Sequence, residues 1–357
     1  MSSRRSTRDL RTQDAQLGGS LPALSQREYE NVYRLAIANQ PPQEGTMGFL
    51  QIASWNIEHL SGAPRAERKQ SAFALADHIE MSGIDVIALQ EVYLTPTDAE
   101  VRLGENQPVI QSRARSERRN ADLDVVCYLL EEHLDDPWAY EIVPNRQAGD
   151  KSQLCAVMWN TKRLTLGKVT ALEVSHEDAE DALWDRKPHL FSFSSEILVW
   201  RRAENGDWQQ LPEKRRLGLV PLHMKSNYGG ITQNRRVRGK EAVSLCAAIE
   251  SVRAEIDPTL VLIGDTNILN NAEPAIEAFI DGGFIDLNNN DSATYWSAQY
   301  KEAPFDRAFV AVDRPEFRYT RQYVLRSSDL TAHDRFLSDH YMIKISVKDY
   351  LDDADPR

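Results

Sequence analysis

Side chains that can hold a metal ion or move a proton recur in this sequence just after short apolar runs. Asn56 comes after the first such run, Glu91 after the second, and Asp265 after a later one. The full set of such residues is Asn56, Glu91, His223, Asp265, Asn267, Asp306, Asp339 and His340. Acids at strand ends that are partly buried cost free energy unless they are paired or bind a cation. The pattern therefore predicts one shared active site at the ends of several strands.

The residue types favour a hard divalent cation. Carboxylates and amides without thiolates suit Mg²⁺, which proteins bind through one or two carboxylates, with water and substrate phosphate completing the shell. Glu91 alone could anchor such an ion, and we expect Mn²⁺ to be able to substitute. The two histidines, His223 and His340, could supply positive charge or act as acid–base groups.

Each of these signals has an ordinary structural alternative. Asn56 could be a turn residue, and Glu91 could complement the dipole of a helix. His223 could be a buried core imidazole, and Asp265 could cap a helix. Six separate matches to one scheme favour the functional interpretation over these alternatives.

The charge balance bears on the substrate. The chain has 357 residues, of which 27% are charged, and its formal net charge of −12 disfavours a polyanionic partner. Bound cations can reverse the local field, however. Basic clusters at 113–119, 214–216 and 235–240 are the places where a nucleic acid would bind, although each can also be explained as a solvated face.

The compartment follows from the cysteines and from the apolar runs. No run is long enough to suggest a membrane span, and the polar start lacks the apolar region of a secretory signal. Cys127, Cys155 and Cys246 match no metal-ligand spacing and are expected to be free thiols. Free thiols fit a reducing compartment, so we expect a cytoplasmic protein without membrane contact.

Apolar periodicity predicts an α/β catalytic domain at 48–348, between a polar, largely disordered tail at 1–47 and an acidic tail at 349–357. The first tail could form one short helix at 26–38. The expected strands are 49–54, 84–89, 155–159, 164–172, 190–199, 216–223, 260–263, 308–312 and 341–347, and the expected helices are 64–81, 123–134 and 237–256. A hairpin turn is expected at 204–207. No internal repeat is visible.

The chain resembles the endonuclease/exonuclease/phosphatase superfamily, which has the deoxyribonuclease I-like fold. The motifs that carry the resemblance, in the family's order, are Trp55-Asn56, Gln90-Glu91, His223–Ser226, Gly264–Asn267, Phe305–Arg307 and Ser338–His340. The resemblance extends over residues 49–347. It implies a two-sheet αββα sandwich with these motifs at one end, and a divalent-metal-dependent phosphodiesterase that uses in-line attack by an activated water.

The resemblance also implies a role for each matched residue. Glu91 would be the main metal ligand, with Asn56 beside it and Asp339 completing or bridging the site. Asp265 would align or deprotonate the attacking water, and Asn267 would hold the phosphate.

The imidazoles have implied roles too. His340 would face the scissile phosphate and would be oriented by a hydrogen bond to Asp306. His223 is similar to the second histidine of the deoxyribonuclease I and sphingomyelinase branches. Glu58 stands where other branches carry Asp, and it could be an auxiliary metal ligand or a surface salt-bridge partner.

Two further residues are predicted to bind substrate. Asn227 follows the His223 motif closely and could contact phosphate. Arg186 lies in a segment that resembles the family's Arg-x-Pro and could support the active-site face, although a plain surface arginine is an alternative.

The sequence falls between branches of the superfamily, so several functions stay open. The first hypothesis is a nuclease acting on DNA, or on RNA. The alternative is a phosphatase or phosphodiesterase of a small or lipid phosphoester. A further alternative is an inactive binding module of the same fold. The expected partner is the nucleic acid substrate, DNA before RNA, and the sequence does not indicate whether the chain has protein partners.

Overall fold

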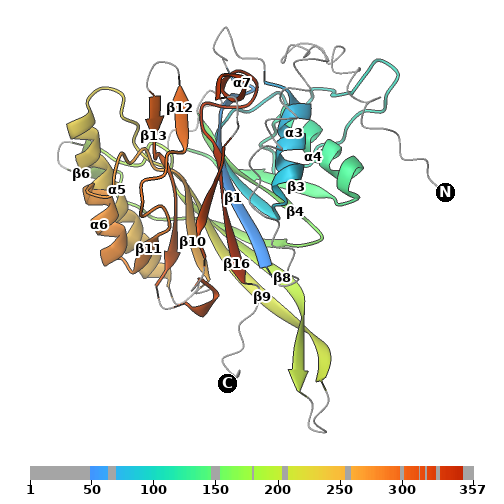
Figure 1. Cartoon of the computed structure of the whole chain (residues 1–357). Helices are drawn as coiled ribbons and strands as arrows, with labels where there is room; N and C mark the ends of the chain where they lie inside the picture. Colours follow the sequence, from blue (N-terminus) through green and yellow to red (C-terminus); the bar gives the residue numbers. More distant parts are fainter. Residues whose placement is uncertain are drawn as a thin grey trace.

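A computed structural model of the chain describes residues 49–62, 70–145, 153–178, 181–202, 208–253, 259–297, 301–312, 314–317, 320–326 and 330–348. Two six-stranded sheets lie against one another, with α3 and α4 on one side of the pair and α5 and α6 on the other (Figure 1). The predicted αββα sandwich is therefore confirmed. The helix expected at 26–38, the turn expected at 204–207 and both predicted tails lie outside the described residues.

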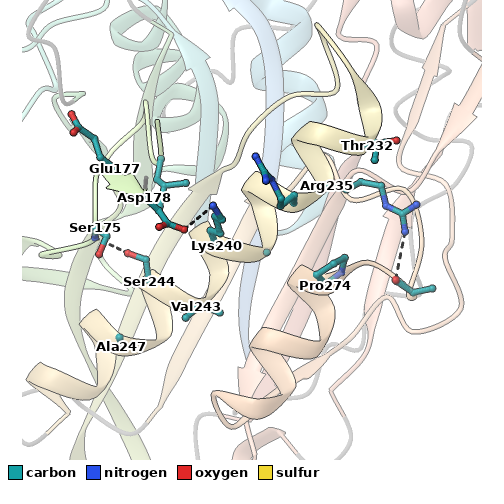
Figure 2. A pocket seen from close by; sticks show the side chains of 14 residues that line it. Ser175, Glu177, Asp178, Thr232, Arg235, Lys240, Val243, Ser244, Ala247 and Pro274 are labelled. Carbon is teal, nitrogen blue, oxygen red and sulfur yellow. Dashed lines mark hydrogen bonds and ion pairs between the residues drawn. The ribbon is translucent and has the colours of Figure 1, made fainter. Parts of the chain in front are cut away.

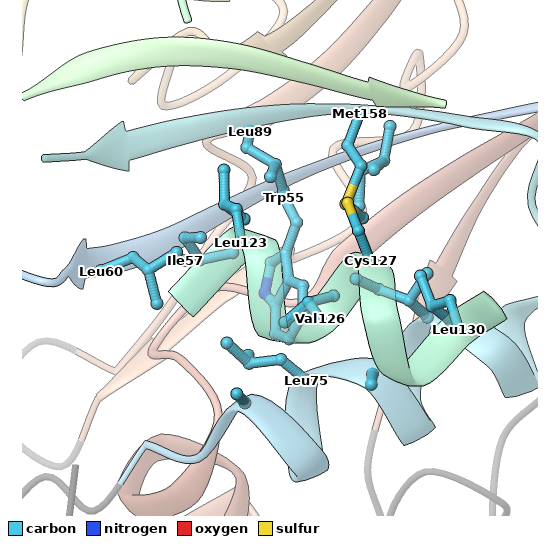
Figure 3. Close-up of a cluster of buried hydrophobic side chains, with 14 of the residues drawn as sticks. Trp55, Ile57, Leu60, Leu75, Leu89, Leu123, Val126, Cys127, Leu130 and Met158 are labelled. Carbon is cyan, nitrogen blue, oxygen red and sulfur yellow. The ribbon is translucent and has the colours of Figure 1, made fainter. Parts of the chain in front are cut away.

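The first sheet has the strand order β15-β16-β1-β2-β4-β3. Its strands are β1 (Phe49–Leu60), β2 (Val86–Val92), β3 (Trp138–Ile142), β4 (Leu154–Asn160), β15 (Gln322–Leu325) and β16 (Met342–Lys348). The helices of this half are α3 (Ala72–Ser82), α4 (Ala121–Leu134) and the short α7 (Leu330–Phe336). Trp55 of β1 projects between α3 and α4 and is fully buried there among Leu75, Val126 and their neighbours (Figure 3). This packing fixes which face of β1 is turned toward the second sheet.

The second sheet has the order β11-β14-β10-β9-β8-β5. Its strands are β5 (Thr165–Ala171), β8 (His189–Arg202), β9 (Trp208–His223), β10 (Leu260–Asp265), β11 (Phe284–Asp286) and β14 (Asp306–Ala311). Its outer face is covered by α5 (Ile231–Val252) and α6 (Pro274–Asp281). The remaining elements are the two-stranded ribbons β6 (Glu177–Asp178) with β7 (Asp181–Ala182) and β12 (Tyr295–Ser297) with β13 (Lys301–Ala303), and the 3₁₀ turn η2 (Pro315–Phe317).

The two sheets repeat one pattern of strand pairing. In the first, β1 and β2 are parallel and every other neighbouring pair is antiparallel. In the second, β10 and β9 are the parallel pair, again third and fourth in the order, and the other pairs are antiparallel. The two sheets share strand topology but not sequence, so no internal repeat is visible in the sequence.

Most predicted elements are present with shifted bounds, for local reasons. The long helix α5 begins at Ile231, six residues before the expected start, because its first turns are polar and carry little apolar periodicity. The helix expected at 64–81 is described only from Ala72, since 63–69 lie outside the described residues. The hairpin strands β8 and β9 extend well beyond 190–199 and 216–223. Short elements such as α6, α7 and β3 were not predicted.

One glycine is required by the close approach of β10 to β9. A Cβ on Gly264 would lie 2.0 Å from the carbonyl oxygen of Leu222 on the parallel neighbour. Any side chain there would push the two strands apart immediately before Asp265.

We predict that Gly264→Ala lowers the free energy of unfolding by about 3 kcal/mol, as overpacking at a closely packed site does. Urea denaturation measures this loss. Gly167→Ala on the edge strand β5 is the matched control, because its added carbon would lie 3.2 Å from the nearest atom, Ser192 O. Equal losses in the two variants would contradict the steric explanation.

Candidate active site

Strand alternation brings the predicted site residues to one end of the core between the sheets. Ile263 of β10 packs in the inter-sheet core, and Asp265 follows on the same face because alternate side chains share a face. The same alternation places Asn56 of β1, His223 of β9 and Asp306 of β14 on the inter-sheet faces of their strands. All of these side chains are buried. The apolar core therefore ends in a polar cluster.

One amide joins the two sheets within this cluster. Asn56 Nδ2 donates to Asp265 Oδ2 at 3.1 Å and lies 3.3 Å from Glu91 Oε1. His223 Nε2 lies 3.8 Å from Asp265 Oδ2 and 4.0 Å from Glu91 Oε1. Four residues predicted from four separate motifs thus come together around one point.

Glu91 reaches this point through a distortion of its strand. Its neighbour Leu89 packs toward the helix layer, so alternation alone would turn Glu91 the same way. Glu91 instead has a left-handed φ of 63°, where the β2–β4 register shifts. Asn267 and Glu58 also have left-handed φ values, 55° and 46°. Such strained backbone is common at functional sites, where the surrounding structure enforces it.

The imidazole of His340 is held by an acid from the other sheet. His340 Nδ1 lies 2.8 Å from Asp306 Oδ2, so the predicted hydrogen bond is present. Thr294 Oγ1 donates to the same carboxylate oxygen at 2.7 Å, a contact that the sequence did not indicate. Burial by itself lowers the pKa of His340, but the Asp306 charge and hydrogen bond outweigh it, and the pKa rises to about 10.

The loop that carries His340 is tied to β1. Trp55 Nε1 donates to the backbone oxygen of His340 at 3.0 Å, and Ser338 Oγ donates to the backbone oxygen of Asn56 at 2.6 Å. His333 Nε2 lies 3.0 Å from the same His340 oxygen. These contacts hold the His340 loop in register with Asn56.

Two predicted metal ligands lie in a second group. Carboxylate oxygens of Glu58 and Asp339 lie within 4.8 Å of one another and of Asp334, which belongs to α7. The backbone nitrogen of Asp339 donates to Glu58 Oε2 at 3.2 Å. Glu58 N also donates to Asn56 Oδ1 at 3.0 Å, so this group adjoins the Asn56 cluster. Asp334 was not predicted, because nothing in its local sequence marks it.

The turn after β10 places Asn267 and Asn227 together. Asn267 N donates to Asp265 Oδ1 at 3.0 Å, and Asn227 Nδ2 donates to the Asn267 backbone oxygen at 2.9 Å. Burial raises the pKa of Asp265 to about 7, with the charges of Asp306 and Glu91 adding to the rise. At neutral pH this carboxyl can therefore either hold or accept a proton.

The donor set fits a hard cation. Carboxylates of Glu91 and Asp265 and the Asn56 amide meet without a thiolate, the ligand chemistry that Mg²⁺ and Mn²⁺ prefer. The raised pKa of Asp265 shows the cost of gathering these acids inside the protein, a cost that a bound cation would offset.

Arg186 lies close enough to act on this cluster electrostatically. Burial is the largest reason that the pKa of His223 falls well below its usual value, and the charge of Arg186 lowers it further. His223 Nδ1 has no hydrogen-bond partner in the described part of the chain. Glu241, which the sequence did not suggest, holds this side of the site by accepting hydrogen bonds from Trp184 N at 2.9 Å and Lys225 N at 3.0 Å.

A buried ion pair behind the site was also missed. Arg238 of α5 and Glu273 are both without exposed side-chain surface and form a two-pronged contact at 2.8 to 3.0 Å. Arg238 Nη1 also donates to Asn227 Oδ1 at 3.0 Å, and Glu273 Oε1 accepts from Leu269 N at 2.8 Å. The pair therefore fixes the two loops that carry Asn227 and Asn267.

Internal ion pairs engage the predicted basic cluster at 235–240 and part of the one at 113–119. Arg236 and Lys240 contact Asp181, at 3.1 and 2.8 Å, and Arg119 contacts Asp124 at 2.6 Å. The ion-paired Arg236 and Lys240 of α5 border a groove of about 800 Å³ that lies between α5, the β6–β7 ribbon and the start of α6 (Figure 2). Paired cations have less to offer a phosphate backbone, so these surfaces fit the solvated-face explanation better.

No protein-family model matches the chain, and no curated protein matches it in sequence. Among solved structures, an endonuclease/exonuclease/phosphatase family protein from Bacteroides thetaiotaomicron is 14% identical with a TM-score of 0.52, over 86% of this chain and 100% of that one. A family protein from Leptotrichia buccalis is 15% identical with a TM-score of 0.52, over 84% of this chain and 99% of that one.

These likenesses identify the architecture. A third structure, an endonuclease/exonuclease/phosphatase from Bacteroides vulgatus, is 13% identical with a TM-score of 0.50, over 84% of this chain and 98% of that one. The chain has the fold of the endonuclease/exonuclease/phosphatase superfamily, as its motifs predicted.

The Asp306–His340 pair should make stability depend on pH. The pKa of His340 is raised from 6.5 to about 10 in the folded protein, so its contribution is complete below pH 6.5 and is lost as pH rises through about 10. We expect His340→Asn to destabilise the protein most at pH 6 and progressively less toward pH 10. Urea unfolding in EDTA across this range measures the difference. A difference that stays constant or grows with pH would contradict the assignment.

The Arg238–Glu273 pair makes a second prediction. Arg238→Ala should cost about 3–5 kcal/mol of unfolding free energy, because it leaves Glu273 buried without its partner. The double change Arg238→Met with Glu273→Leu should recover most of that stability. Denaturation curves measure both effects. A double variant as unstable as Arg238→Ala would show that the pair is not the source of the loss.

Proposed function

We propose that the protein is a divalent-metal-dependent phosphodiesterase, and that its substrate is a nucleic acid, DNA before RNA. The observation that supports this most is the contact of Asn56 with both Glu91 and Asp265, beside the Asp306–His340 pair. These contacts bring three groups together: Glu91 as a ligand for a cation, Asp265 with a pKa of about 7, and the protonated imidazole of His340. The superfamily fold supports the same assignment.

Glu91 and Asn56 would hold the metal, and Glu58 with Asp339 would extend the site. When bound, the ion supplies Lewis acidity at the phosphate and lowers the negative charge around it. Asp265, with a pKa of about 7, aligns the attacking water and accepts its proton.

His340 remains protonated near neutral pH and stabilises charge on a non-bridging phosphate oxygen. Asn267 and Asn227 hold the phosphate from the opposite loop, and Arg186 and His223 line the cluster. Because His340, Asn227 and Asn267 are held by hydrogen bonds before substrate arrives, they can favour in-line attack without reorganising.

A small phosphoester is the second candidate substrate. The internal pairing of Arg236, Lys240 and Arg119 favours it, since paired cations attract a long phosphate backbone less strongly. An inactive binding module is less well supported, because every principal site residue is present.

We also propose that 48–348 forms one catalytic domain and that the protein works in the cytoplasm. Cys127, Cys155 and Cys246 are free thiols, which fits a reducing compartment. Among the described residues, no helix combines the length and the apolar character needed to cross a membrane.

The assignment is tested with purified protein and plasmid DNA. Mg²⁺ or Mn²⁺ should allow nicking, EDTA should abolish it, and His340→Ala or Glu91→Gln should lower the rate by about 10²- to 10⁴-fold. Glu100→Gln, on an exposed acid, is the matched control for the loss of a carboxylate.

The outcomes separate the candidates. Intact plasmid, single-stranded DNA and RNA together with cleavage of a p-nitrophenyl phosphodiester would exclude the nuclease and favour the small substrate. No hydrolysis of any phosphoester and no thermal stabilisation by Mg²⁺ or Mn²⁺ would favour the inactive module.

A further inference from the structure

An aromatic side chain stands in solvent beside the site. Tyr228 is 92% exposed, the most exposed large hydrophobic residue in the described part of the chain. It directly follows Asn227, whose amide contacts the backbone of Asn267. Ile231, three residues later at the start of α5, is 53% exposed. Tyr228 and Ile231 therefore present apolar surface next to the loop that carries Asn267.

The backbone that carries Tyr228 is held on both sides. Before it, Arg238 Nη1 donates to Lys225 O at 3.1 Å and to Asn227 Oδ1 at 3.0 Å. After it, Asn234 Nδ2 donates to the Tyr228 backbone oxygen at 2.7 Å. The ring is thus presented from a fixed segment, so its exposure is a feature of the folded structure.

The space around this segment is open. A Cβ on Gly229 or Gly230 would meet no atom within 4 Å, and both glycines have positive φ values, 88° and 141°. A turn of this shape admits glycine readily and other residues poorly. The turn between Asn227 and α5 is therefore bordered by open space that a ligand can enter.

A neutral aromatic ring suits a substrate group that is flat and uncharged. Stacking on a base needs no cation, whereas the arginines and lysine of α5 next to this segment are already paired with acids. Base–aromatic stacking also tolerates any base, because every base has a π-face. An alkyl chain would need a broader continuous apolar surface than Tyr228 and Ile231 provide.

We propose that Tyr228 is a stacking platform for the nucleobase next to the scissile phosphate. The inference rests on the proposed phosphodiesterase function for its orientation, since the phosphate is taken to lie at Asn267. Tyr228 acts as a specificity-determining residue: it distinguishes a phosphodiester that carries a base from one that does not.

The test is equilibrium binding, which does not require turnover. The probes are a short phosphorothioate oligothymidylate and the same backbone with abasic residues, each titrated into the full-length protein in EDTA. Tyr228→Ala should reduce the preference for the base-bearing probe by about five- to a hundredfold. Tyr228→Trp should keep or raise that preference, because it retains a flat ring.

Val243→Ala is the matched control, since Val243 is another exposed apolar residue of α5, 60% exposed and three turns away. It should bind both probes as the unaltered protein does. An unchanged preference in Tyr228→Ala, or equal weakening toward both probes, would overturn the proposal. So would the absence of any base preference in the unaltered protein.

Hydrolysis is measured separately, so the two proposals can fail independently. A protein that shows the Tyr228-dependent preference but cleaves no phosphoester would disprove the phosphodiesterase and leave the stacking site in place. A protein that cleaves DNA with a preference insensitive to Tyr228 would do the reverse.

Discussion

The contact of Asn56 with acids on both sheets is the constraint on which the rest of the site depends. Each sheet brings half of the chemistry, and neither half is useful unless the strand ends meet in one register. Asn56 Nδ2 links the two sheets: it donates to Asp265 of the second sheet and also contacts Glu91 of the first. The Asp306–His340 hydrogen bond is a second link between the two halves, because it joins β14 of the second sheet to the loop before β16 of the first. The apolar faces between the sheets make this meeting of polar groups possible, because they fix the relative position of the strands.

Much of this arrangement was legible in the sequence. Apolar runs followed by Asn, Glu, His or Asp identified the strand ends, and the resemblance to a superfamily supplied the sandwich and the Asp306–His340 bond. The orientation of Glu91 could not be derived from alternation, because a left-handed residue and a register shift reverse it.

The supporting residues that the sequence did not reveal act through contacts between segments that are distant in the chain. Thr294 supports Asp306 from 12 residues away in the chain, and Arg238 reaches Glu273 across 35 residues. Neither threonine nor arginine carries a local mark of such a role. Glu273 is an acid, a residue type that is rarely fully buried, yet its side chain has no exposed surface. Long-range partners of this kind follow only from the packing.

The repeated pairing pattern of the two sheets has a consequence for how this activity could be lost or gained. Strand β1 corresponds to β10, β2 to β9, and β16 to β14 in the two orders. At the ends of the two parallel pairs, Asn56 of β1 is paired with Gln90 of β2, and Asp265 of β10 is paired with His223 of β9. The two sheets therefore repeat the same strand pairing but carry different side chains at the strand ends that form the site. Because backbone hydrogen bonds alone maintain the strand pairing, exchange of a polar side chain at one of these strand ends would change the chemistry of the site while the pairing stays the same.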